Sequence, residues 1–498
     1  MRRRRPPRLS RPSLALAALL VPLAAAAPVE AALFVPNKTA DTFDGACDAD
    51  CSLREAIAAA NARRGPDVVV LGPGIYVLTR AGAGEDAGAT GDLDVTDDLD
   101  LVGSDPAATV LDGVGLDRVL DVNRARLDAQ GVTVRNGAVE GDGGGLRIRS
   151  GGLTLGDVVV RGNVARGGSG GGIWSSGELT LNRVTLADNL ADVHGGGLAA
   201  RQAVAAANAT VSGNRADVGG GLYLFPPAGG RIVNATITAN TAATRGGGVM
   251  AESAQAVLFG SSILAGNGAP ADADCAGAIG SGGFNLLGIG GGCGAFAAAK
   301  GDKVGSPAAP LDPRLEPLAS AGGPTPTHPL TATSPAVDAG EPPPGDEPLP
   351  VGLGCEPVDQ RGAARPGQGS ARCDAGAFER TDSCVPSDTA LCLGGGRFRV
   401  RATSKLVKQP ARPAGAVELT GDSGALWFFD PANVEMTVKV LDACAISGHY
   451  WVFLAGLTDV EVTVVVEDTA TGAAKTYVHA RGTPFTPILD TAAFDTCE

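Results

Sequence analysis

One repeat constrains this chain more than any other feature. An alternating apolar run ends in an Asn and is followed, after a short gap, by three glycines; the Asn recurs at a nearly constant interval, at Asn136, Asn163, Asn189, Asn214, Asn240 and Asn267. The glycine triplets keep the same interval and centre on Gly144, Gly171, Gly196, Gly220 and Gly247. Such a fixed period indicates stacked units, none of which buries its apolar face alone. We therefore predict an all-β fold built on a parallel β-helix.

The repeats align as coils of that stack. They begin LTLGDVVVRGN at Leu153, LTLNRVTLADN at Leu179, VAAANATVSGN at Val204 and RIVNATITAN at Arg231, and residues 67–79 and 92–135 supply earlier, less regular coils. We expect about eight or nine coils over residues 67–284. Side-chain amides in register should hydrogen-bond along the stack at Asn163, Asn189, Asn214, Asn240 and Asn267. A second polar column is expected at Asp157, Asn182, Asn208 and Asn234, and we assign both columns to stability.

The N-terminus predicts export. Residues 1–31 combine a basic segment, an apolar run from Leu14 to Ala27 and a small-residue cleavage site, which is typical of a secretory signal. No stretch reaches 18 apolar residues, so we expect no transmembrane segment and an extracellular or cell-surface location. Removing the signal removes six Arg and one Glu and moves the formal net charge from -14 to -19. A chain this acidic repels phosphate backbones, which excludes nucleic acid as a partner.

Ten cysteines in an exported chain indicate disulfide bonds. Neighbouring positions suggest four pairs, Cys47 with Cys51, Cys275 with Cys293, Cys355 with Cys373 and Cys384 with Cys392, which leaves Cys444 and Cys497 for each other. A metal site is the weaker interpretation, because the four His are scattered and no C-x-x-C occurs.

Residues 32–66 are predicted to form an N-terminal cap with one helix. Ser52 can cap it, with Glu55 three residues on as in a capping box. Such a helix would cover the open end of the stack. The stretch Cys51-Ser-Leu-Arg-Glu-Ala56 also resembles the signature of the CSLREA domain family. That resemblance implies an exported bacterial surface protein in which the motif precedes a right-handed parallel β-helix, and we favour a structural role for these residues over a catalytic one.

An acidic run, Asp92, Asp94, Asp97, Asp98 and Asp100, raises the question of calcium. Alternation with Leu93, Val95, Leu99 and Leu101 explains it more simply, since most of the acids would then face water. The calcium-loop pattern also fails at its sixth and twelfth positions. We predict no cofactor, and calcium stays open as an alternative.

Two further resemblances cover the middle of the chain. The apolar-x-x-Asn and Gly-Gly-small-apolar elements of residues 130–267 resemble the repeats of polymorphic outer-membrane proteins, which are surface-exposed and adhesin-like. Residues 285–380 resemble the choice-of-anchor Q domain, through Asn285 to Gly288, Asp312 to Leu315, Gly322 to His328, Ser334 to Gly340, Asp359 to Gly362, Arg365-Pro366 and Cys373 to Glu379. Many Pro and Gly residues predict irregular capping coils here. His328, Asp338 and Arg361 invite a catalytic interpretation, but we favour a structural role in rigid turns.

From Cys384 the glycine triplets end and longer alternating strands begin, so residues 384–498 predict an antiparallel β-sandwich. Aromatic residues stand in these strands, among them Trp427 and Trp451. Such residues stack on sugar rings when exposed, but we expect core packing, because aromatic residues in strands are usually buried.

The best candidate site lies between the repeated Asn and the glycines. Aligning the coils puts Asp192 and Asp217 at one station, with Arg166 in the preceding coil and with His194 and Arg245 beside the glycines. Two carboxyls about 5 Å apart would suit a retaining glycosidase. A solvated charge ladder has the same appearance, and we favour it because the motifs of polygalacturonases and pectate lyases are missing.

These observations predict an exported, non-enzymatic, adhesin-like scaffold that binds glycans or other cells. Two alternatives remain. One is a polysaccharide lyase or glycoside hydrolase that uses Asp192, Asp217 and His194. The other is a carbohydrate-binding protein that acts through Trp427 and Trp451.

Overall fold

The structure is a computed structural model. It describes residues 31–497 apart from 253–254, 297–300, 332, 342–352, 368–371, 381–383, 385 and 470. All but the last residue of the predicted secretory signal therefore lies outside the described residues. Among the described residues there are two helices, and nearly all other regular structure is strand.

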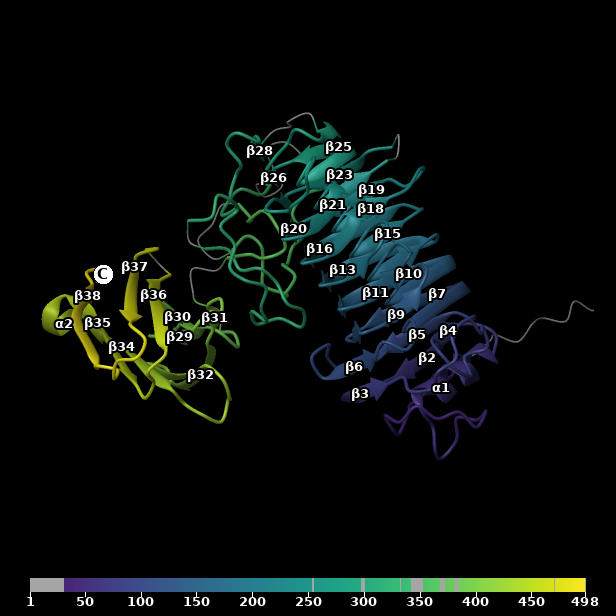
Figure 1. The fold of residues 1–498 in the computed structure, drawn as a ribbon, viewed down its shortest axis with the longest axis horizontal. Coiled ribbons are helices and arrows are strands. Elements are labelled where there is room, and N and C mark those ends of the chain that lie inside the picture. The colour runs from purple at the N-terminus through teal and green to yellow at the C-terminus, as the bar shows by residue number, and fades with distance from the viewer. Residues whose placement is uncertain are drawn as a thin grey trace, which may run out of the picture. The chain divides into compact units, whose positions relative to one another are not determined.

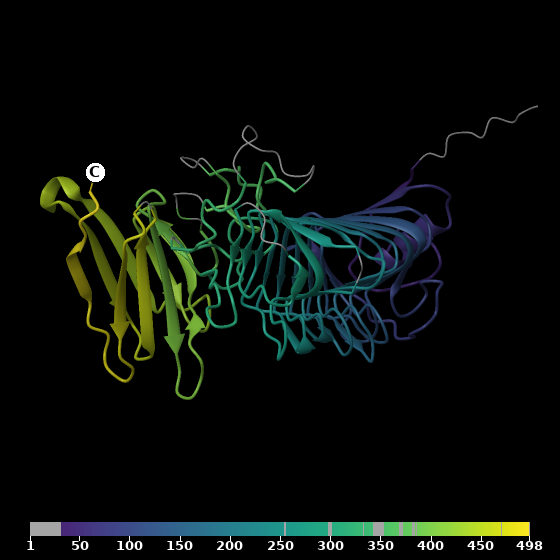
Figure 2. The ribbon, with the colours of Figure 1, turned by 90° about the horizontal axis from the view of Figure 1, so that it is seen from above.

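The N-terminal part is a right-handed parallel β-helix of about seven turns (Figures 1 and 2). Its largest sheet consists of β1 (Leu33–Phe34), β2 (Asp67–Val70), β3 (Gly74–Val77), β4 (Leu93–Val95), β5 (Leu99–Val102), β6 (Thr109–Asp112), β7 (Leu120–Gln130), β8 (Thr133–Arg135), β10 (Leu146–Arg161), β12 (Ile173–Ser175), β13 (Glu178–Ala187), β15 (Leu198–Ala200), β16 (Val204–Ser212), β18 (Leu222–Leu224), β19 (Gly230–Val233), β20 (Thr236–Thr238), β22 (Val249–Ala251), β23 (Val257–Gly260), β24 (Ile263–Leu264), β25 (Cys275–Gly283), β26 (Leu286–Leu287), β27 (Cys293–Ala295) and β28 (Lys303–Val304). A second parallel sheet runs along the stack and consists of β9 (Ala138–Glu140), β11 (Val164–Arg166), β14 (Leu190–Ala191), β17 (Arg215–Val218) and β21 (Thr241–Arg245).

The first two coils are longer than the repeat, and the structure has about seven turns where eight or nine coils were predicted. Asp67 pairs with Leu99, and Leu99 pairs with Leu127, so each of these coils uses more residues than the regular period provides. The regular interval is reached in the next coil, in which Leu127 pairs with Leu153.

The glycine triplets allow neighbouring coils to approach closely. A Cβ atom on Gly171 would lie 2.4 Å from the Leu190 carbonyl oxygen and 2.6 Å from that of Gly196. Gly170 before it has a φ of +70°, which favours glycine. Each triplet therefore marks a point where backbone packs directly on backbone.

The repeated asparagines form a buried ladder. Their side-chain Nδ2 groups donate to the Oδ1 of the next Asn over 2.9 Å in each step from Asn163 through Asn189, Asn214 and Asn240 to Asn267. The second polar column differs from the prediction. Register places Arg183, not Asn182, between Asp157 and Asn208, because Gly156 pairs with Asn182 and Val158 with Val184. What the column shares is a positive φ, which Arg183 adopts at 55°, so residue type alone misplaced it by one position.

The N-terminal helix α1 (Leu53–Asn61) begins as predicted. Ser52 accepts from the Glu55 backbone N–H, and the Glu55 carboxylate accepts from the Ser52 N–H, which completes the capping box. Arg54 is buried and binds Asp41 together with the carbonyl oxygens of Gly88, Gly91 and Asp92. The helix thus covers the first coils and also holds the segment before β4 in place.

Two acids of the run at 92–100 are buried, contrary to the predicted alternation. Asp92 and Asp94 are at most 4% exposed, whereas Asp98 and Asp100 face solvent. Arg118 binds Asp92 at 2.7 Å, and Asp94 accepts from the Gly88 N–H at 2.8 Å. The chain before β4 covers this part of the outer face, which a period-two pattern does not reveal.

The described residues of 305–379, where capping coils were predicted, lie along the side of the stack. Gln360 accepts from Thr210 at 2.7 Å and donates to Thr185 at 2.9 Å, so it joins two coils. Asn208 donates to the Val358 carbonyl, and Ser212 bonds to His328 at 2.8 Å. We call residues 305–379 the lateral segment. Its Leu330 and Phe378 form a small core together with Ile263 and Leu286 of the β-helix.

All ten cysteines are paired, in the five predicted combinations: Cys47–Cys51, Cys275–Cys293, Cys355–Cys373, Cys384–Cys392 and Cys444–Cys497. Among the described residues, no helix is both long enough and apolar enough to cross a membrane.

The C-terminal part has two antiparallel sheets around a separate core, as predicted. One sheet contains β29 (Leu391–Leu393), β30 (Phe398–Lys405), β31 (Arg412–Pro413), β36 (Glu461–Asp468) and β37 (Ala474–His479). The other contains β32 (Gly415–Thr420), β33 (Ser423–Trp427), β34 (Met436–Ala443), β35 (His449–Gly456) and β38 (Ile488–Phe494), and the short helix α2 (Cys444–Ser447) joins β34 to β35.

Candidate functional site

The strip predicted between the Asn ladder and the glycine triplets exists as a surface of the second sheet. Leu190 pairs with Val164 on one side and Arg215 on the other. Two residues further on, Arg166, Asp192 and Asp217 therefore follow one another in one column of adjacent coils, about 4.8 Å per step. We call Arg166, Asp192, His194, Asp217 and Arg245 the turn strip.

Three residues of the turn strip, Asp192, Asp217 and Arg245, make hydrogen bonds or an ion pair with neighbouring coils. Asp192 is exposed, and its Oδ2 accepts from the Gly167 N–H at 2.7 Å. The Thr244 hydroxyl donates to the Asp217 carbonyl oxygen, not to its carboxylate. Arg245 approaches Asp272 with 3.3 Å between Nη2 and Oδ2. Asp192 thus supports the preceding turn, which is a structural use of a carboxylate.

His194 brings in aromatic residues that the sequence argument did not single out. Its ring lies on Tyr223 with 4.2 Å between centroids and meets Phe225 edge-on at 5.4 Å. The guanidinium of Arg201 lies 4.3 Å above the Phe225 ring. Tyr223 also interacts with the Glu252 carboxylate through its hydroxyl. We call His194, Arg201, Tyr223, Phe225 and Glu252 the aromatic patch.

Register explains why these residues meet. Ala200 pairs with Leu224, and Leu224 pairs with Ala251. The residues that follow these three are Arg201, Phe225 and Glu252. A cation, an aromatic ring and a carboxylate therefore occupy equivalent positions on three successive coils.

Most of the charged groups that act on His194 in the aromatic patch are carboxylates. Burial lowers the pKa of His194, while the carboxylates of Glu252, Asp217 and Asp142 act in the opposite direction. Burial and the hydrogen bond with Glu252 raise the pKa of Tyr223. His194 is therefore neutral near pH 7, and Tyr223, which is buried, keeps its proton in the hydrogen bond with Glu252.

A signal for these aromatic residues was present in the repeat. The third residue after each triplet centre stands in one column, in which Trp174 pairs with Ala199, Ala199 with Tyr223, and Tyr223 with Met250. Aligning the coils on their glycines as well as on their asparagines would have shown large side chains here.

The catalytic interpretation of the lateral segment does not fit its contacts. His328 bonds to Ser212 and to the Glu316 carbonyl oxygen, each at 2.8 Å. Arg361 binds Asp359 at 2.7 Å and lies 3.6 Å above the Phe378 ring. Each group thus has structural partners of its own.

An acidic cluster with two buried members and one exposed member is the one group among the described residues with metal-binding geometry. Single carboxylate oxygens of Asp86, Asp94 and Asp121 all lie within 4.8 Å of one another. Arg149 binds both Asp86 and Asp121 at 2.5 Å, and Arg147 binds Asp121 as well. Burial raises the pKa of Asp92 to about 6 and that of Asp94 to about 7. Arginines and protons therefore supply the positive charge that calcium would bring.

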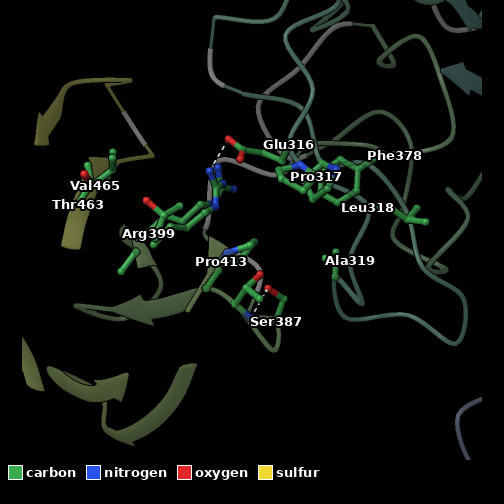
Figure 3. A pocket seen from close by; sticks show the side chains of 17 residues that line it. Glu316, Pro317, Leu318, Ala319, Phe378, Ser387, Arg399, Pro413, Thr463 and Val465 are labelled. Carbon is green, nitrogen blue, oxygen red and sulfur yellow. Dashed lines mark hydrogen bonds and ion pairs between the residues drawn. The ribbon is translucent and has the colours of Figure 1, made fainter. Parts of the chain in front are cut away.

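A pocket with a volume of about 360 Å³ lies between the lateral segment and strands β30 and β36 (Figure 3). Its walls are mainly apolar, with Pro317, Leu318 and Phe378 on one side and Val465 on the other. Its charged residues pair with glutamates, Arg401 with Glu316 and Arg399 with Glu467. It offers apolar surface and a few hydroxyls.

The two tryptophans of the C-terminal sheets are half-buried and do not belong to the core, contrary to our expectation. Phe398, Tyr450 and Phe494 fill the core instead. Trp451 donates to the Ser447 hydroxyl at 2.9 Å and meets Phe453 edge-on at 6.1 Å. Phe453 pairs with the exposed Leu489, so an apolar stripe crosses this sheet.

Comparison with known protein families, with curated proteins and with solved structures gave no match.

Proposed function

We propose that this protein is an exported, non-enzymatic scaffold that binds glycans through the aromatic patch. The observation that supports it is the column of Arg201, Phe225 and Glu252 beside His194, because aromatic rings next to hydrogen-bonding groups are what sugar rings require. The resemblances to the CSLREA, choice-of-anchor Q and polymorphic outer-membrane families point to the same surface-associated role. Five disulfides suit an oxidising compartment.

The test is a panel of plant and microbial polysaccharides scored for both binding and cleavage. We expect binding that falls at least tenfold on Phe225→Ala, with no new reducing ends and no unsaturated products. Asp128→Ala is the control, since Asp128 lies in β7, outside the aromatic patch, and its side chain is 40% exposed. Absence of all glycan binding would overturn the proposal.

Cleavage is the outcome that would favour an enzyme. Turnover lost on Asp192→Ala or Asp217→Ala would restore the lyase or hydrolase alternative. The hydrogen bond from Gly167 to Asp192 argues against it, because a carboxylate held by the backbone supports its turn whether or not a substrate is bound.

A second candidate function rests on the stripe of Trp451, Phe453 and Leu489. If glycan binding survives Phe225→Ala but is lost on Trp451→Ala, the C-terminal module is the binding element.

A further inference from the structure

The charges around the aromatic patch favour one class of glycan. Five carboxylates surround it or lie along the adjoining strip: Asp142, Asp192, Asp217, Glu252 and Asp272. Three guanidiniums accompany them, those of Arg166, Arg201 and Arg245. With His194 neutral, this surface has a formal charge of -2, and the whole chain has -14. Uronic acids and sulfated sugars would be repelled.

The Phe225 ring is already in contact with a cation of the chain, the guanidinium of Arg201. The Arg201 guanidinium is exposed and lies 4.3 Å above the ring, which is cation–π geometry. In the next coil, Glu252 stands at the same station and interacts with Tyr223. A ligand ammonium on Phe225 would thus have a ring face beneath it and a carboxylate beside it.

We propose that the aromatic patch selects glycans with free amino groups, such as glucosamine chains, and that Arg201 is an internal cation which such a ligand displaces from Phe225. This inference rests on the proposed glycan-binding function and names the ligand class. It separates two roles for Arg201. If the ligand is cationic, Arg201 competes with it; if the ligand is neutral, Arg201 is a hydrogen-bond donor that helps to bind it.

The experiment compares two oligosaccharides with one backbone, a glucosamine hexamer and an N-acetylglucosamine hexamer. Binding to the full chain is measured by calorimetry at low salt and at a pH where the amine is protonated. We expect the glucosamine hexamer to bind at least tenfold more tightly, and added salt to weaken it. We also expect Phe225→Leu to weaken it at least tenfold.

The direction in which Arg201→Ala changes glucosamine affinity decides between the two roles of Arg201. We expect it to strengthen glucosamine binding severalfold, because the ring face and Glu252 lose a competing cation. Arg126→Ala is the matched control, since it removes an exposed arginine, 57% accessible in its side chain, from strand β7, outside the aromatic patch. It changes the net charge equally and should leave affinity unchanged.

Four outcomes would overturn the inference. Equal or tighter binding of the acetylated hexamer would reject amino-group selection and leave the glycan-binding function standing. Weaker binding on Arg201→Ala would make it a ligand-binding residue. An equal gain on Arg126→Ala would show a general charge effect. Binding of neither hexamer would reject the inference, and the polysaccharide panel then decides whether glycan binding itself stands. If Phe225→Leu fails to fold by thermal unfolding, the Arg201 result still decides.

Discussion

Single side chains in the ladder satisfy several buried groups at once. Asn214 donates to Asn240 and to the Leu186 carbonyl, and its Oδ1 accepts from the backbone and side chain of Asn189. Asn214→Ala would leave these groups unpaired in the stack. We expect a loss of about 3 kcal/mol in the free energy of unfolding, measured by denaturant titration.

Asn182→Ala is the matched control for that ladder variant. Asn182 is exposed and lies one residue outside the column of positive φ, so we expect a change within about 0.5 kcal/mol. Similar losses for both variants would contradict a special role for the ladder.

His328 should make stability depend on pH. It is buried between Ser212 and Glu316, and burial lowers its pKa from 6.5. The unfolded chain therefore takes up a proton near pH 6.5 while the folded chain stays neutral, so this contribution is complete above pH 6.5 and is lost as the pH falls. We expect wild type to lose about 1 kcal/mol more than His328→Gln between pH 8 and 5.5, measured by denaturant titration at each pH.

His449→Gln serves as the control for the pH experiment, because His449 is half-buried in the C-terminal sheets. Identical pH profiles for wild type and His328→Gln would show that His328 does not carry this dependence.

Residue types in the sequence predicted the ladder well and the neighbouring column poorly. The ladder needs side-chain amides in register, so its period can be recognised in the sequence from the spacing of the Asn residues. The column at Arg183 needs only a backbone conformation, which several residue types adopt. The burial of Asp92 depends on a covering segment, and no local pattern encodes that.

At the scale of elements, helix α1 acts as a cap because its single arginine, Arg54, holds a separate segment. Arg54 binds Asp41 and three carbonyl oxygens from residues 88–92. Arg54→Ala would leave a buried carboxylate unpaired, and we expect a loss of about 3–5 kcal/mol. Limited proteolysis should show new cuts between residues 79 and 92.

Arg63→Ala tests whether any arginine of this region has the same effect. Its side chain is 52% exposed and lies 3.8 Å from Asp67, so we expect no new cuts. Equal proteolysis of both variants would reject the proposed link between the helix and this segment.

The strands and the helix were largely predictable from the sequence. Which segment packs over which coils was not. Alternation and glycine spacing locate the strands, and the capping box locates the helix. The lateral segment bonds to coils far away in sequence: Gln360 reaches Thr185, 175 residues earlier. The Pro-rich composition of the lateral segment shows where strands end, but it does not show which surface of the β-helix the segment covers. The aromatic patch was missed for a related reason, since its members come from three coils.

At the scale of the whole molecule, two cores imply two unfolding steps. The β-helix core runs from Cys51 to Cys293, and the C-terminal core runs from Leu391 to Phe494. Two of the three tryptophans lie in the C-terminal sheets, while Trp174 lies in the β-helix. Tryptophan fluorescence therefore reports mainly the C-terminal part, and far-UV circular dichroism weights the longer β-helix.

Core variants should move these steps separately. Phe398→Ala opens a cavity at a fully buried position of the C-terminal core, and we expect it to destabilise that part by about 3–5 kcal/mol. Ile237→Ala does the same in the β-helix at about 2–5 kcal/mol. The first should shift the fluorescence transition in denaturant and leave the main dichroism transition in place, and the second should do the reverse. A single transition shifted by both variants would mean that the sheets and the β-helix unfold as one cooperative unit.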